Sequence, residues 1–80
     1  MNKKENLTKA AQIVLSGIEN ESEPIKPEIL ANKLGLKMRT IRYGLKLLID
    51  ANLIIQQPDL HDLRSYYYIQ NTNEHKSIPA

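Results

Sequence analysis

The chain has 80 residues, of which 41% are apolar and 25% are charged, and its formal net charge is +2. These values are typical of one small soluble domain whose core is near the lower limit for folding alone. The absence of cysteine excludes a disulfide framework, a thiolate nucleophile and a zinc–thiolate site, and no apolar run approaches the ~20 residues that span a bilayer. A cytoplasmic location fits this composition.

The first segment with helical periodicity follows a polar amino terminus. Asn6 or Thr8 can cap this predicted helix, which extends to about residue 18. Its apolar side consists of Leu7, Ala11, Val14, Leu15 and Ile18. The acidic stretch 19–23 is a predicted link. Residues 24–26, which are flanked by prolines, are predicted to be extended and short enough only for an edge strand.

Two short helices joined by a turn are predicted next. Pro27 suits the first position of a helix, because the N–H that it lacks would be unpaired there. Gly35 supplies the left-handed residue that ends a helix, and a second helix begins at Met38 and covers residues 38–50. The predicted buried side of this second helix is Ile41, Leu45 and Leu48. This is the helix-turn-helix pattern, whose second helix usually enters a groove of DNA.

Positive charge is concentrated in the same segment. Residues 26–46 contain six Lys or Arg residues and one Glu, a net charge of +5, so the rest of the chain carries −3. Lys37 and Arg39 lie at the amino end of the second helix, where the helix dipole disfavours cations, and a bound phosphate would relieve this conflict. The residues expected to contact DNA are Lys37, Met38, Arg39, Thr40, Arg42, Tyr43 and Lys46. The alternative is a merely solvated basic face.

A β-hairpin is predicted after the second helix, which ends near residue 51 with Asn52 in the left-handed conformation. Residues 53–57 and 66–70 are rich in β-branched, apolar and aromatic side chains and are the predicted strands. The polar, turn-prone stretch 58–65 between them is predicted to be an eight-residue loop.

The tyrosines of the second strand are assigned to faces by alternation. Tyr67 and Ile69 are predicted to face inward, and Tyr66 and Tyr68 outward. Residues 71–80 lack periodicity and are predicted to be a flexible tail, so the folded domain is expected to end at residue 70.

The order helix, short strand, helix, helix and hairpin resembles a winged helix-turn-helix domain, which is mainly α-helical with a small β-hairpin. The segment PEILANKLGLKMRTIRYGLKLLIDANLI resembles the DNA-contacting part of MarR-type and ArsR-type transcriptional regulators. The loop DLHDLRS, residues 59–65, resembles the MarR wing, where Asp and Arg recur at this spacing. The strand ending at Ile69 and Gln70 resembles that family's closing wing strand. The likeness covers residues 7–70.

The resemblance implies a sequence-specific regulator that binds double-stranded DNA as a homodimer. The helix 38–50 would enter the major groove, and the wing, residues 56–66, would lie on the flanking minor groove. His61 stands at the place of the first wing arginine, so only Arg64 carries over as a DNA contact. The chain stops where MarR-type proteins continue into long dimerisation helices, so its own dimer contacts are not implied. ArsR-type metal sensing is not implied, because the cysteine ligands are absent.

The wing residues admit more than one interpretation. Asp62 is expected to hold the Arg64 guanidinium in a bidentate grip and aim it at the minor groove. The alternative is an ordinary surface ion pair of Arg64 with Asp59 or Asp62, which contributes little. His61 with the two aspartates is better explained as turn-forming residues than as a metal site. No metal or other cofactor is expected.

Leu47 and Ile49 lie outside the buried stripe of the second helix and are predicted to form a partner interface, with cover by the first helix or the tail as the alternative. Two rival functions stay open. One is a protein-interaction module of the transcription machinery, and the other is single-strand binding through stacked tyrosines. Neither histidine belongs to a nucleophile or acid–base constellation, so an enzyme is not expected.

Overall fold

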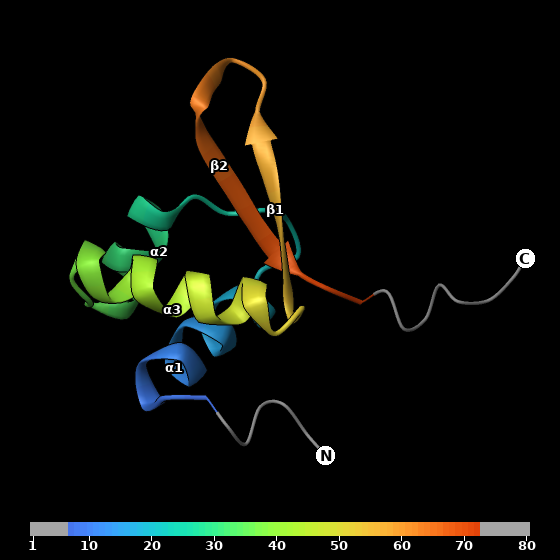
Figure 1. The fold of residues 1–80 in the computed structure, drawn as a ribbon. Coiled ribbons are helices and arrows are strands. Elements are labelled where there is room, and N and C mark those ends of the chain that lie inside the picture. The colour runs from blue at the N-terminus through green and yellow to red at the C-terminus, as the bar shows by residue number, and fades with distance from the viewer. Residues whose placement is uncertain (1–6, 73–80) are drawn as a thin grey trace, which may run out of the picture.

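The computed structural model describes residues 7–72, which form three helices and an antiparallel β-hairpin (Figure 1). The elements are α1 (Lys9–Glu19), α2 (Pro27–Leu34), α3 (Met38–Asp50), β1 (Ile54–Asp59) and β2 (Asp62–Gln70). This is the winged helix-turn-helix architecture that the sequence predicts. No helix in the described range is long and apolar enough to cross a membrane.

Local signals determine where the helices begin and end. The side-chain oxygen of Thr8 accepts a hydrogen bond from the N–H of Ala11 at 3.1 Å and caps α1, whereas the alternative cap, Asn6, lies outside the described residues. Gly35 ends α2 with a φ of 67°, and Asn52 follows α3 with a φ of 61°. Glycine adopts this left-handed conformation freely and asparagine tolerates it. The predicted helix boundaries are confirmed.

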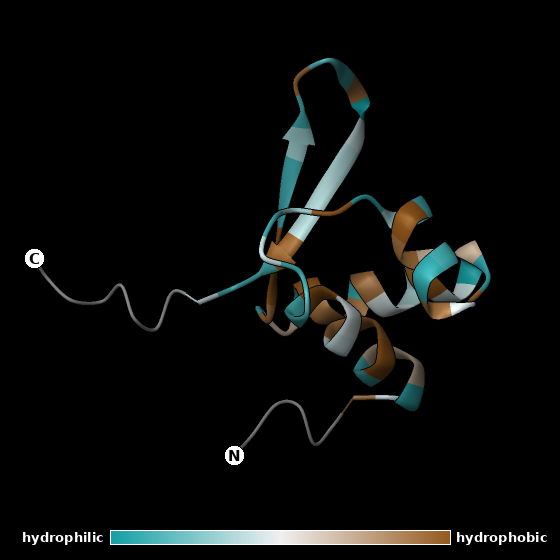
Figure 2. Cartoon of the chain, turned by 180° about the vertical axis from the view of Figure 1, so that it is seen from behind, coloured by the Kyte–Doolittle hydropathy of each residue, from teal (hydrophilic) through white to brown (hydrophobic). Residues whose placement is uncertain are grey.

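The three helices and the base of the hairpin enclose one apolar core. Its buried members are Ala11, Val14, Leu15, Ile18, Ile25, Leu30, Ile41, Leu45, Leu48, Ile54 and Tyr68. Figure 2 shows the apolar segments gathered in the helices, while most of the hairpin is hydrophilic. α1 and α3 approach closely at Gly44, where an added methyl group would lie 3.0 Å from Val14 Cγ2. The sequence did not reveal this contact, because it depends on how two helices cross.

The turn of the hairpin is shorter than predicted. β1 continues through Pro58 to Asp59 and β2 begins at Asp62, so only two residues connect the strands instead of eight. An Asp59 side-chain oxygen accepts a hydrogen bond from the N–H of His61 at 2.9 Å and stabilises the turn. The pairing register shifts between Pro58 and Asp59, which accommodates a proline that has no N–H to donate.

The inward face of β2 is the opposite of the predicted one. Tyr68 is 8% exposed and belongs to the core, whereas Tyr67 and Ile69 are half-buried and Tyr66 is 39% exposed. The cause is long-range. The predicted extended piece 24–26 forms a single bridge in which Ile25 and Tyr68 exchange two backbone hydrogen bonds of 2.9 Å, and this pairing holds Tyr68 against the helices.

The described start of the predicted tail is attached to the body. The N–H of Asn71 donates to the Leu53 carbonyl at 2.9 Å, and its side-chain amide donates to the Asn52 carbonyl at 2.9 Å. The rest of the predicted tail, residues 73–80, lies outside the described residues.

Candidate nucleic-acid interface

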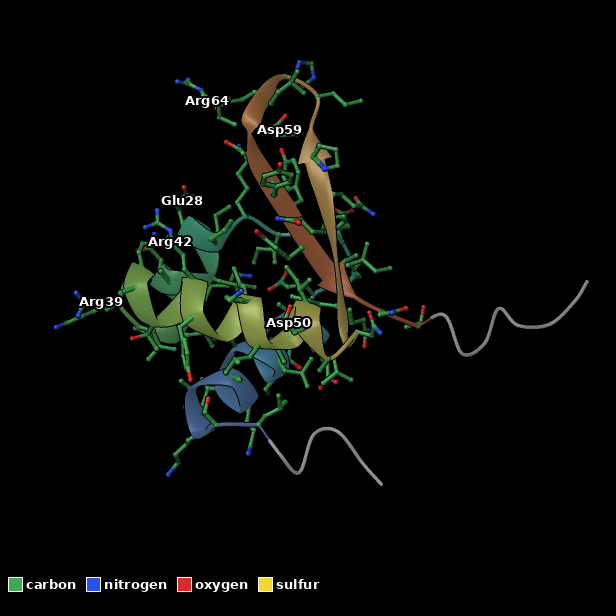
Figure 3. The ribbon with its side chains drawn as sticks, in the orientation of Figure 1. Glu28, Arg39, Arg42, Asp50, Asp59 and Arg64 are labelled. Atoms are coloured by element: carbon green, nitrogen blue, oxygen red, sulfur yellow. The ribbon has the colours of Figure 1, made fainter. Side chains whose placement is uncertain are left out.

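A cleft of about 500 Å³ lies between α3 and the wing, which we define as residues 56–66. Its lining residues are Met38, Arg42, Leu45, Lys46, Ile49 and Asp50 of α3, Pro27 and Glu28 of α2, and Gln56, Arg64, Ser65, Tyr66 and Tyr68 of the hairpin. Figure 3 shows Arg39, Arg42 and Arg64 pointing to the same side of the molecule. The fold therefore brings the predicted cations of the helix and of the wing to one face.

The cations of α3 have no acidic partner in the part of the chain that the structure describes. Arg39, Arg42 and Lys46 are exposed, and no ion pair involves them within residues 7–72. The residue that precedes the helix, Lys37, is also exposed, and α3 has no side-chain cap at its amino end. Its first N–H groups and these cations are therefore available to the same anion.

Two other bases of the basic segment are already paired. Lys33 Nζ lies 2.6 Å from Glu21 Oε2, and Lys26 Nζ lies 2.9 Å from Asp59 Oδ2. The net charge of +5 counted in the sequence therefore overstates what this face offers a ligand. Sequence reasoning missed both pairs, because their acids lie outside the basic segment.

The predicted contact residues divide between two sides of α3. Met38, Arg42 and Lys46 line the cleft, whereas Arg39, Thr40 and Tyr43 do not. Thr40 is half-buried and Tyr43 is 51% exposed. A ligand that filled only the cleft would therefore miss half of the predicted set, whereas a double helix can contact both sides of the exposed helix.

Two carboxylates that the sequence did not assign to the site also line the cleft. Glu28 lies in the first turn of α2, where the helix dipole favours an acid, and Asp50 lies in the last turn of α3, where it does not. Glu28 and Arg42 both line the cleft, although no ion pair joins them within the described range. Their presence restricts where a phosphate can bind.

The predicted bidentate grip of Asp62 on Arg64 is wrong. A single contact of 3.4 Å joins Arg64 Nε to Asp62 Oδ1, and the Arg64 side chain is 92% exposed. Asp62 instead accepts hydrogen bonds from the Arg64 N–H and the Ser65 hydroxyl, each at 3.1 Å. These short-range contacts compete for the carboxylate, so Asp62 orders the start of β2 and holds the guanidinium by a single long contact.

The acidic residues of the wing have shifted pKa values. The hydrogen bond from Lys26, followed by that from the His61 N–H, lowers the pKa of Asp59 below its ordinary value of 3.8. The Arg64 N–H, followed by the Ser65 hydroxyl, lowers the pKa of Asp62 in the same direction. Both carboxylates are therefore ionised at neutral pH. In residues 7–72 no three His, Asp or Glu side chains gather to hold a metal ion.

These shifts predict an acid-labile wing. A carboxylate with a lowered pKa in the folded state adds stability above its ordinary pKa, and this contribution is lost as the pH falls through the folded value. We expect the melting temperature of the wild-type chain to fall as the pH is lowered from about 5 to below the ordinary carboxyl pKa of 3.8, and that of Asp59→Asn to fall less. Circular dichroism measures both, and equal pH dependence of the two proteins would contradict the expectation.

The predicted partner interface lacks the exposure that it assumed. Leu47 and Ile49 are half-buried and pack against the core, and Ile49 also lines the cleft. The interface therefore stays a prediction. Among residues 7–72, the most exposed large apolar side chains are Leu60, at 81%, and Leu63, at 69%, both at the wing tip. Leu60 belongs to the two-residue turn and Leu63 to the start of β2.

Solved structures match this chain, whereas no protein-family model and no curated protein does. A MarR family transcription regulator matches 91% of this chain and 48% of its own, with a TM-score of 0.75 and 20% identity. A protein from the thermoacidophilic archaeon Sulfolobus tokodaii matches 92% of this chain and 71% of its own, with a TM-score of 0.75 and 26% identity. A transcriptional regulator from Thermotoga maritima matches 92% of this chain and 51% of its own, with a TM-score of 0.73 and 23% identity.

The chain therefore has the winged-helix fold of MarR-family regulators, as its resemblance predicted. It spans about half the length of the two regulators, 48% of one and 51% of the other. Both are named as regulators of transcription and not as enzymes.

Proposed function

We propose that this domain binds double-stranded DNA sequence-specifically and regulates transcription. The observation that carries the proposal is the cleft between α3 and the wing, which has Arg42 and Lys46 on one wall and Arg64 on the other. Arg42 and Lys46 have no acidic partner among residues 7–72, and the ion pair of Arg64 is a single exposed contact. A surface of this kind attracts the phosphate backbone and releases its counterions.

In the proposed complex α3 lies in the major groove. The rise from Arg39 to Lys46 is about 10 Å, which fits a groove about 12 Å wide. Arg and Lys bind the O6 and N7 atoms of guanine, Thr40 can contact a thymine methyl group or a phosphate, and Tyr43 can donate to a phosphate. Met38 adds an apolar contact at the start of the helix. Recognition would thus use both sides of α3.

The wing would follow the flanking minor groove. Arg64 lies near the tip of the hairpin and is almost fully exposed, so its guanidinium can enter a narrow A·T tract. The turn residues Leu60 and His61 are exposed beside it. Single-strand binding through stacked tyrosines has less support, because Tyr66 is the one exposed member of the three.

We further propose that the regulator acts as a homodimer on two half-sites about 34 Å apart. This part of the proposal rests on the resemblance to MarR-type regulators. Of the predicted interface, Leu47 and Ile49 offer only half-buried side chains. The symmetry of the bound DNA is therefore the better evidence to collect.

Selection of bound fragments from genomic DNA tests the proposal. We expect the enriched fragments to share a motif with two-fold symmetry. Enrichment without a shared motif would contradict sequence-specific binding, whereas a shared motif without symmetry would contradict only the dimer. A scrambled duplex of the same length and base composition is the control.

A further inference from the structure

The ion pair between Lys26 and Asp59 joins the helical body to the wing, and we name it the wing–helix ion pair. We infer that it fixes the wing relative to α3 and so positions Arg64 for DNA, which makes Lys26 and Asp59 positioning residues and not DNA contacts. The inference rests on the proposed function. It concerns a lysine that the charge count alone would assign to the DNA-binding surface.

The wing has little else to hold it beyond its base. Asp59 is 6% exposed and is the single buried side chain between Gln56 and Tyr67. Nearer the body, the bridge between Ile25 and Tyr68 anchors the hairpin. A two-stranded hairpin anchored only at its base is flexible, so a contact near its tip has a large effect on where the tip lies.

Both oxygens of the Asp59 carboxylate are used. Oδ2 accepts from Lys26 Nζ at 2.9 Å, and Oδ1 accepts from the N–H of His61 at 2.9 Å. The hydrogen bond between the pair raises the pKa of Lys26 and lowers that of Asp59, so both groups stay charged over the ordinary pH range. A single side chain therefore closes the turn and ties that turn to the body.

Lys26 is itself well held. Its carbonyl accepts hydrogen bonds of 3.1 Å from the N–H groups of Ile29 and Leu30 and so begins α2. Its ammonium group lies 5.2 Å from the centroid of the Tyr67 ring, a cation–π distance. Lys26 thus starts α2, the helix that precedes α3, and contacts both strands of the hairpin. It therefore connects the helices, which form one wall of the cleft, to the wing, which forms the other.

Arg64 depends on this arrangement because little else orders it. Its side chain is 92% exposed and has one contact of 3.4 Å. Fixing the wing in advance reduces the entropy lost when the guanidinium binds. Asp59 therefore helps DNA binding although it carries a negative charge on the DNA-facing element, whereas charge counting predicts that it hinders binding.

Positioning by Asp59 and simple charge counting predict opposite changes in DNA affinity for one substitution. Asp59→Asn should weaken binding to a duplex that carries the selected motif, by at most the loss that Arg64→Ala causes, roughly tenfold. The matched control is Asp50→Asn, which removes the same charge from an exposed carboxylate of the cleft and should tighten binding. Fluorescence anisotropy at one salt concentration measures both. Tighter binding by Asp59→Asn would overturn the inference.

A double-mutant cycle separates positioning from general stabilisation. If Asp59 acts through Arg64, the loss of duplex affinity caused by Arg64→Ala should be smaller in the Asp59→Asn background than in the wild-type background. The loss caused by Arg42→Ala, on the other wall of the cleft, should be the same in both backgrounds. An unchanged Arg64→Ala loss in the Asp59→Asn background would overturn the inference, since Asp59 would then only stabilise the hairpin.

A second variant covers the case in which Asp59→Asn does not unfold cooperatively. Lys26→Met keeps an unbranched side chain of similar length and removes the ammonium group, so the cycle with Arg64→Ala can be repeated in that background with the same two outcomes. Failure of the proposed function is distinguishable from failure of this inference. In the former case Arg42→Ala has no effect on duplex binding in the wild-type chain, and in the latter it still does.

Discussion

Replacing Arg42 and Lys46 together by alanine should weaken duplex binding roughly a hundredfold, about tenfold for each lost charged contact. The two residues are one helical turn apart, line the same cleft and have no acidic partner in residues 7–72. Each lost phosphate contact should also flatten the plot of log K against log salt by ~0.9. Fluorescence anisotropy at several salt concentrations measures both quantities.

The control for this prediction removes the same net charge elsewhere. Lys9 and Lys33 are exposed and do not line the cleft, so the double alanine variant at these positions should bind almost as the wild-type chain does. Equal losses in the two double variants would show that only overall charge matters. Unchanged affinity of the Arg42 and Lys46 variant, with unaltered melting, would favour the protein-interaction function.

Leu48→Ala should lower the free energy of unfolding by ~2–5 kcal/mol, because Leu48 is 0% exposed and its removal leaves a cavity. That is a large part of the ~5–15 kcal/mol that stabilises a typical domain. Leu48 is on the buried side of α3, so its packing holds the exposed, basic side of the helix in place. Urea unfolding measures the effect.

The neighbouring residue provides the comparison. Leu47 is half-buried, so Leu47→Ala should lower the free energy of unfolding clearly less than Leu48→Ala does. Similar losses at both positions would mean that Leu47 is covered as completely as Leu48, for example by a second copy of the chain. Sedimentation of the wild-type chain at the same concentration distinguishes that explanation.

The helices were predictable because their signals are local. Pro27 at a first helical position, Gly35 and Asn52 in the left-handed region, and apolar residues at helical spacing act within a few residues of the boundary that they determine. The face of β2 was not predictable in this way. It depends on the bridge between Ile25 and Tyr68, which lie far apart in the sequence.

The candidate site was predictable in part for the same reason. Helical periodicity alone places Arg39, Arg42 and Lys46 on the exposed side of α3. It says nothing of which bases have acidic partners, because Asp59 is far from Lys26 in the sequence and lies next to it only in the folded structure. The wing tip also depended on a two-residue turn, which the hydrogen bond from the His61 N–H to Asp59 stabilises.

Titration of one selected duplex and of its separated strand, each at several salt concentrations, tests the central claim most directly. Lys37, Arg39, Arg42, Lys46 and Arg64 are the proposed cationic contacts. The account predicts preferential binding of the duplex, with log K falling linearly with log salt at a slope no steeper than about −4.5 per chain. Equal binding of the single strand, or a slope near zero, would contradict it.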